Sequence, residues 1–162
     1  MKTVFLALGS NVGDREVNMR TAVARLGSDE IRVVRRSSLY ETAPREMLDQ
    51  PWFLNAVVEA ETSLFPMQLL ARIRDIERQM GRRRVTPKGP RNIDIDILFY
   101  GRSVIATTEL EVPHPRIGER RFVLEPLAEI APDFRHPVTG KTAVEMLAAL
   151  EPQGVRRLSI SL

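Results

Sequence analysis

The chain has 162 residues, a formal net charge of +3 and no cysteine. This length fits one domain, and the lack of cysteine excludes a disulfide scaffold, a thiol nucleophile and a cysteine-bound metal. The N-terminal apolar run, Val4–Leu8, is too short for a signal-peptide core, and no apolar segment approaches the length of a membrane span. We therefore expect residues 1–162 to form a single cytoplasmic domain without a membrane partner.

Turn and helix signals divide the first part of the chain. Residues 3–8 are typical of a buried strand that ends at Gly9, and Asp14 suits the N-cap of a following helix. Residues 31–41, and then about 53–61, have the composition of a second and a third strand.

A second helix and a fourth strand complete the core pattern. Pro66 suits the first turn of this helix, its apolar residues recur with a period of 3.6, and Gly81 suits its end. A strand at about 93–100 follows. The order βαββαβ predicts an α+β fold with a ferredoxin-like core and an antiparallel sheet. Residues 101–162 are expected to add a short hairpin and two C-terminal helices, near 121–129 and 142–150.

The fourth strand carries the most informative pattern, because isoleucine and aspartate alternate from Ile93 to Ile97. Alternation places Asp94 and Asp96 on one face, with Cα atoms about 6.5–7 Å apart. Two carboxylates so close favour a hard cation such as Mg²⁺, which accepts a few carboxylates together with substrate phosphates. Two other readings are a solvated acidic face and the carboxyl pair of a retaining glycosidase. Dense arginine and an aromatic content of 6% argue against a sugar-stacking groove.

Cations cluster just before this strand, between Arg82 and Arg91. Such a cluster indicates either an anionic ligand or a solvated basic loop, and the adjacent aspartates favour the ligand. This connection and the one at 42–52 are long for a compact domain. Both are candidate lids over a site.

Two further segments suit a phosphate and a flat ring. His114 lies in a rigid Val-Pro-His-Pro run followed by arginines, whose planar forks match phosphate oxygens, whereas His136 is expected to have no role. Phe53 and Asn55 share a strand face and suit a planar heterocycle, unless they only pack in the core. Together with the aspartates, these parts suit phosphoryl-type transfer to a planar acceptor.

Three motifs follow one another in the order and spacing of a known family. They are Leu8-Gly9-Ser10-Asn11, then Gly89-Pro90-Arg91-x-x-Asp94-x-Asp96-Ile97, then Val112-Pro113-His114-Pro115 before Arg120-x-Phe122-Val123-Leu124. Over nearly its whole length the chain resembles the 6-hydroxymethyl-7,8-dihydropterin pyrophosphokinases of folate biosynthesis. The resemblance implies Mg²⁺-dependent transfer of pyrophosphate from ATP to the pterin hydroxymethyl group, which gives AMP and the pterin diphosphate. It implies two Mg²⁺ ions and a monomer that binds these small molecules and no nucleic acid.

The resemblance also implies residue roles. Asp94 and Asp96 would bind both metal ions, and they would form the catalytic set together with Arg82 and Arg91. The residues implied to bind ATP are Arg74, Glu77, Arg82, Arg84, Lys88, Arg91, Ile97, His114 and Arg120. Those implied to bind the pterin are Thr42, Ala43, Arg45, Phe53, Asn55 and Phe122. This sequence departs from the best-known form of the family at Arg74, Lys88, Glu109, Glu111 and Pro115.

Two other classes of protein share some of these features. A sugar-nucleotide transferase can use an Asp-x-Asp motif, but the early Gly-Ser-Asn and the βαββαβ order do not suit its fold. An RNA-binding ferredoxin-like module should display stacking aromatics on its sheet, where this chain places aspartates.

Overall fold

The computed structural model describes residues 1–43, 49, 51–81 and 92–162. One main sheet contains six strands, and a small two-stranded sheet lies beside it. In chain order the elements are β1 (Lys2–Ser10), α1 (Arg15–Leu26), β2 (Ile31–Arg36), β3 (Ser38–Thr42), β4 (Phe53–Thr62), α2 (Pro66–Gln79), β5 (Asp94–Tyr100), β6 (Ile105–Ala106), β7 (Glu111–Val112), the 3-10 turn η1 (Ile117–Glu119), α3 (Arg121–Ile130), α4 (Ala143–Ala148) and β8 (Val155–Ser161).

The main sheet has the order β5-β1-β4-β3-β8, and β2 also pairs with β4. All of these pairs are antiparallel. Because β4 lies between β1 and the β2–β3 stretch, the core has the split βαβ arrangement that the sequence predicted. The predicted fold class, with its extra hairpin (β6–β7) and C-terminal helices (α3 and α4), is confirmed.

The predicted second strand is two strands, broken at Ser37. Arg36 faces Val58, whereas Tyr40 faces Asn55, so the β2–β3 stretch carries an extra residue relative to β4. The buried Ser37 hydroxyl accepts from the Val57 N–H at 2.9 Å, and the Ser37 N–H donates to the Val57 carbonyl at 3.0 Å. A side-chain oxygen thus replaces one backbone acceptor, which is why propensity alone did not reveal the break.

The edge strand β8 was not anticipated. It pairs with β3, and its residues are mostly half-buried or exposed. A strand with such weak alternation leaves little signal in the sequence.

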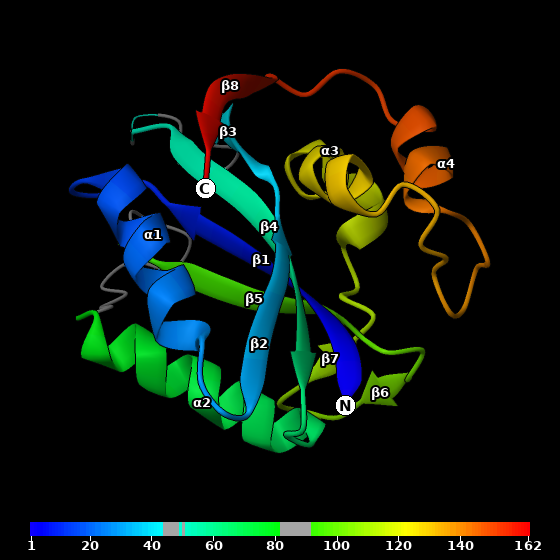
Figure 1. Cartoon of the computed structure of the whole chain (residues 1–162). Coiled ribbons are helices and arrows are strands. Elements are labelled where there is room, and N and C mark those ends of the chain that lie inside the picture. Colours follow the sequence, from blue (N-terminus) through cyan, green and yellow to red (C-terminus); the bar gives the residue numbers. More distant parts are fainter. Residues whose placement is uncertain (44–48, 50, 82–91) are drawn as a thin grey trace.

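Helices cover both faces of the sheet, with α1 and α2 on one side and α3 and α4 on the other (Figure 1). Strand alternation divides the core in the same way. Leu6 and Leu8 pack in the cluster that contains the helical residues Met19 and Leu69, while Phe5 packs in the cluster that contains α3.

Candidate active site

The register of the central strands brings the predicted aspartates and the predicted pterin residues onto one face. Gly9 in β1 pairs with Asp94 in β5 on one side and with Asn55 in β4 on the other. Asp96 pairs with Ala7, which packs in the α3-side core. Both aspartates therefore lie on the α3 side of the sheet, and the isoleucines that alternate with them point into the α1–α2 core. Adjacent strands are about 4.8 Å apart, so roughly 10 Å separates the Asp94 and Asn55 backbones.

Gly9 forms the floor between these two residues. A Cβ atom at position 9 would lie 3.1 Å from Asn55 Oδ1 and 3.9 Å from Phe53 Cδ1. The absence of a side chain therefore lets the Asn55 amide lie close against the middle strand, where Gly9 is itself buried. In the sequence, a close approach of Gly9 to a ligand is a weaker reading than a plain strand–turn–helix, but a glycine inside a strand often marks such an approach.

The pterin-side residues of β3 and β4 are joined by a buried hydrogen bond. Asn55 Nδ2 donates to Thr42 Oγ1 at 2.7 Å, and both residues are buried. Phe53 lies two residues before Asn55, so its half-buried ring is on the same face. The predicted grouping of an aromatic ring with a carboxamide is present, with the Thr42 hydroxyl as its support.

Phe122 comes from α3, where it packs at the edge of the α3-side core. The Arg120 guanidinium lies 5.5 Å from the centre of the Phe122 ring. Glu129, at the other end of α3, accepts from the Tyr40 hydroxyl at 2.8 Å. Burial, reinforced by Glu129, raises the pKa of Tyr40. Since Tyr40 pairs with Asn55, this contact ties the helix of Phe122 to the strands of the pterin side.

Glu77 on α2 contacts the outer edge of β5. It accepts from the Ile95 N–H at 2.9 Å, so this N–H points away from β1. Backbone groups two residues apart in a strand share a direction, so Ile97 is expected to direct its N–H and carbonyl to the same outer edge. The predicted nucleotide residues Glu77 and Ile97 thus lie together at the edge strand.

His114 is held beside this edge. The backbone N–H of His114 donates to the Leu98 carbonyl at 3.0 Å. The imidazole Nδ1 accepts from the backbone N–H of Arg116 at 3.2 Å. Burial lowers the pKa of His114 to about 4, and Arg120 and Arg116 act in the same direction, while Asp94 opposes them. The imidazole is therefore neutral at neutral pH and lies within electrostatic reach of both an aspartate and an arginine of the site.

Two departures from the best-known form of the family meet in the structure. Arg74 on α2 forms an ion pair with Glu109, at 3.7 Å, in the turn between β6 and β7. Both side chains are about half exposed, so the pair is expected to add little stability. Arg74, predicted to contact ATP, is thus also a partner of Glu109.

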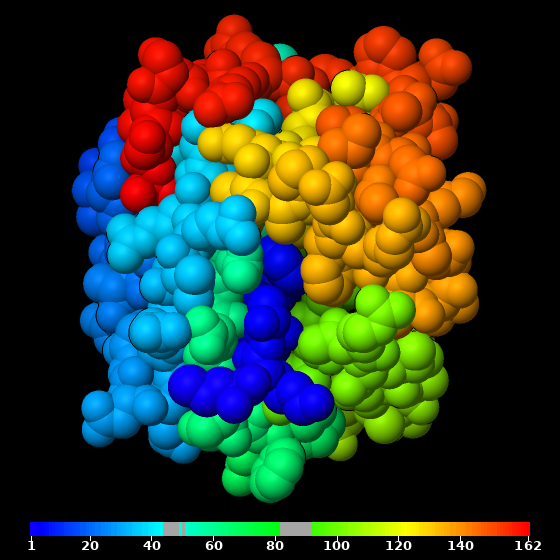
Figure 2. Space-filling model, turned by 45° about the vertical axis from the view of Figure 1, so that its right-hand side comes forward, coloured from blue at the N-terminus to red at the C-terminus, as the bar shows by residue number. Residues whose placement is uncertain are grey.

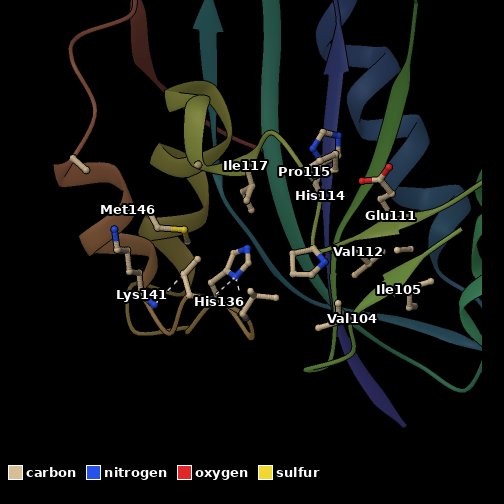
Figure 3. Close-up of a pocket in the computed structure, with 16 residues that line it drawn as sticks. Val104, Ile105, Glu111, Val112, His114, Pro115, Ile117, His136, Lys141 and Met146 are labelled. Atoms are coloured by element: carbon tan, nitrogen blue, oxygen red, sulfur yellow. Dashed lines mark hydrogen bonds between the residues drawn. The ribbon is translucent and has the colours of Figure 1, made fainter.

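A cavity of about 460 Å³ lies next to this region, between the hairpin and the segment that contains His136 (Figure 3). The two parts of the chain that form its walls adjoin on one face of the molecule, where light green meets orange in Figure 2. Of the predicted site residues that the structure describes, His114 alone lines it. His136, for which no role was expected, lies on the opposite wall near Lys141 and Met146.

Part of the predicted site lies outside the described residues. These predictions concern the basic connection and one residue of the loop between β3 and β4: Arg82, Arg84, Lys88, Arg91 and Arg45. Ala43 is described, and its N–H donates to the Gly154 carbonyl at 3.4 Å.

The described residues contain no group of three or more His, Asp or Glu side chains arranged to hold a metal ion. Asp94 and Asp96 lie two residues apart on one face of β5. Such a pair suits a cation that takes its remaining ligands from water and a substrate.

A carboxylate pair that shares one sheet face with an aromatic ring and a carboxamide, with β1 between them, is the arrangement expected of a group-transfer enzyme. Residues 5–132 match the family described as 7,8-dihydro-6-hydroxymethylpterin-pyrophosphokinase (HPPK). The chain belongs to this family, as its motifs predicted.

Named relatives agree with this assignment. The chain is 45% identical over 159 residues to a 2-amino-4-hydroxy-6-hydroxymethyldihydropteridine pyrophosphokinase of Methylorubrum extorquens, an alignment that covers 98% of this chain and 99% of the relative. It is 46% identical over 153 residues to the enzyme of the same name from Bacillus subtilis, covering 94% of this chain and 87% of that one. A folic acid synthesis protein of Pneumocystis carinii is 48% identical over 139 residues, or 86% of this chain, but the match spans only 19% of that longer protein.

Solved structures support the fold. A wild-type HPPK-DHPS of Plasmodium falciparum has a TM-score of 0.73 at 17% identity, covering 91% of this chain and 44% of that chain. An HPPK-DHPS in complex with substrates has a TM-score of 0.74 at 14% identity, covering 92% and 45%. At such low identity, the likeness concerns the fold alone.

Proposed function

We propose that this chain transfers pyrophosphate from ATP to the hydroxymethyl oxygen of 6-hydroxymethyl-7,8-dihydropterin, giving AMP and the pterin diphosphate. Membership of the family supports this reaction, as do the names of relatives that the chain matches along nearly their whole length. The observation that carries the proposal is the row Asp94, Gly9 and Asn55, which places an anionic group and a hydrogen-bonding amide on either side of Gly9 in β1.

The acceptor ring would lie on the Asn55 side of the row. Asn55, oriented by Thr42, offers both an acceptor and a donor, which match the alternating donors and acceptors of a pterin edge. Phe53 and Phe122 would hold the two faces of the ring, since aromatic side chains stack on flat heterocycles. Ala43 and Arg45 would flank the same slot, in keeping with the resemblance.

Asp94 and Asp96 would hold two Mg²⁺ ions on the other side of the row. Their oxygens are the hard ligands that Mg²⁺ prefers. When bound, Mg²⁺ would neutralise phosphate charge and align the transferred group.

The nucleotide would lie along the β5 edge. The backbone of Ile97 would pair with the adenine edge, and Glu77 would hold the strand in register through the Ile95 N–H. Neutral His114 can donate a hydrogen bond to a phosphate oxygen through Nε2–H, because its Nδ1 already accepts from Arg116. Arg120 would add a positive charge, and Arg82, Arg84, Lys88 and Arg91 would supply the rest from the basic connection.

One assay tests the reaction class. The protein incubated with ATP, Mg²⁺ and the dihydropterin should release AMP in proportion to the pterin consumed. Release of ADP, or nucleotide turnover that does not depend on pterin, would contradict the proposal.

Other expectations stay predictions. In the part of the chain that the structure describes, none of the helices combines the length and apolarity that a membrane span requires. The single domain, the monomeric state, the cytoplasmic location and the lack of a nucleic-acid partner remain to be measured.

A further inference from the structure

An ion-pair cluster lies behind the pterin side, on the opposite face of the sheet. Its members are Arg15 at the start of α1, Glu41 in β3, Trp52 before β4, and Arg156 in β8. Glu41 and Trp52 directly precede Thr42 and Phe53, which are facing partners at the ends of β3 and β4. We call these four residues the Glu41 cluster.

The Glu41 carboxylate binds two guanidinium groups. Its Oε2 lies 3.0 Å from Arg15 Nη1, and its Oε1 accepts from Arg156 Nε at 3.1 Å. The hydrogen bond from Arg156 is the largest influence that lowers the pKa of Glu41, and Arg15 adds to it. The Glu41 side chain is only 13% exposed, so these contacts are less screened than those of a typical surface pair.

Trp52 connects the cluster to β4. Arg15 Nη1 donates to the Trp52 carbonyl at 2.9 Å, and the Arg156 guanidinium lies 5.6 Å from the centre of the Trp52 ring. The cluster therefore joins the end of β3 to the start of β4, and both to α1 and β8. Its hydrogen bonds involve ionised groups, which makes them stronger than neutral ones.

The cluster cannot touch an acceptor bound on the α3 side, because adjacent side chains of a strand point to opposite faces. Glu41 thus acts on the site only through the backbone that it shares with Thr42, whose hydroxyl orients Asn55. A nearby contact acts in the same way: buried Asn11 donates from Nδ2 to the Pro51 carbonyl at 3.0 Å.

We propose that Arg15, Glu41 and Arg156 are positioning residues for the acceptor: they hold Thr42 and Phe53 in the geometry that binds the pterin, and they do not set the affinity for the nucleotide. This inference rests on the proposed function, and it deepens that function by separating acceptor binding from nucleotide binding within one sheet.

The test compares KM values for the two substrates. In Glu41→Gln, which keeps the shape and removes the charge, and in Arg156→Ala, the KM for the dihydropterin should rise about 5–20-fold. The KM for ATP should stay within about twofold in both variants. Arg156→Lys keeps the charge but loses the planar fork, so it should recover only part of the pterin affinity.

Glu61→Gln is the matched control. It removes a carboxylate from another cross-strand pair, Arg32–Glu61, whose atoms are 2.7 Å apart at the far end of β4. This control should leave both KM values unchanged. A thermal melt of each variant shows whether a rise in KM comes from loss of the fold or from loss of positioning in a folded protein.

The outcomes distinguish failure of the proposed function from failure of the positioning role. Wild-type protein that forms no AMP with the pterin would overturn the proposed function and the positioning role with it. A normal wild-type enzyme whose folded Glu41 and Arg156 variants keep their pterin KM, or lose affinity for ATP equally, would overturn the positioning role alone.

Discussion

The two halves of the site are built differently. The proposed acceptor side consists of residues carried by neighbouring strands and one helix: Thr42, Phe53, Asn55 and Phe122. The proposed nucleotide side consists of residues at the edge strand and beyond it: Arg74, Glu77, Ile97, His114 and Arg120. On the acceptor side the central contact is a buried, neutral hydrogen bond of 2.7 Å, whereas the nucleotide side includes an exposed ion pair of 3.7 Å.

The geometry of the acceptor side is set by strand register, whereas binding on the nucleotide side is set by charge. A buried hydrogen bond between two strands is costly to break, so the acceptor slot should keep its shape before any substrate binds. Exposed charges interact weakly with each other and can exchange partners, which suits the binding of a polyphosphate. Four predictions test this contrast, in order of decreasing expected effect.

The carboxylate pair should matter most. Asp94→Ala or Asp96→Ala should reduce AMP formation by at least about a thousandfold, because metal-assisted stabilisation of charge supplies several kcal/mol of the barrier reduction. Asp75→Ala on α2, an exposed aspartate paired with Arg78, is the control and should retain activity. In a thermal melt, Asp94→Ala and Asp96→Ala should unfold at a temperature close to that of the wild type. Substantial activity in the double variant would refute the metal assignment.

A substitution at Gly9 tests whether the acceptor side and the nucleotide side can be perturbed separately. In Gly9→Ala, the new methyl group would meet Asn55 Oδ1 at 3.1 Å, so the KM for the pterin should rise about 10–100-fold. Gly118→Ala is a suitable control, since a Cβ atom there has no neighbour within 4 Å. Equal weakening of ATP and pterin binding would show that the two sides are not separable.

The buried histidine should produce a pH dependence of stability. The pKa of His114 is lowered from 6.5 to about 4, so between these values the unfolded chain binds a proton that the folded chain does not. Stability should therefore fall as the pH drops from 6.5 to 4, by about 1–3 kcal/mol for this partly exposed group.

Urea unfolding across this pH range measures the effect. The chain has two histidines, so a His136→Asn background isolates His114. Adding His114→Gln to that background should flatten the plot of unfolding free energy against pH. A slope that persists after this substitution would assign the titration to another group.

The Arg74–Glu109 pair should have the smallest effect. A double-mutant cycle of Arg74→Ala and Glu109→Ala should give a coupling energy in unfolding of no more than about 0.5 kcal/mol, as exposed pairs do. A coupling above about 1 kcal/mol would show that the edge of the nucleotide side is as firmly built as the acceptor side.

Regular periodicity made much of the fold predictable. The alternation of Ile93–Ile97 predicted both the strand and its two faces, and the buried isoleucines confirm it. Asp14 was expected to cap the first helix, and its carboxylate accepts from the Val17 N–H at 3.1 Å. These features depend on local geometry, which the order of residues specifies directly.

Other features depend on contacts between distant segments. The break at Ser37 exists because a hydroxyl replaces a backbone acceptor for Val57, and β8 exists because β3 offers it an edge. Neither leaves a periodic signal. The role of Gly9 likewise requires the register that places it between Asp94 and Asn55.

The sequence by itself determined the α+β order, the face that carries the two aspartates and, through its motifs, the family. Those properties are local, or are carried by residue types at fixed spacing. Only the tertiary structure decided that Asp94 and Asn55 flank Gly9 on one face of the sheet, and that Glu41, Arg15 and Arg156 meet behind the acceptor side. The physical reason is that register and long-range ion pairs arise from packing among segments up to 115 residues apart, and no short pattern records them.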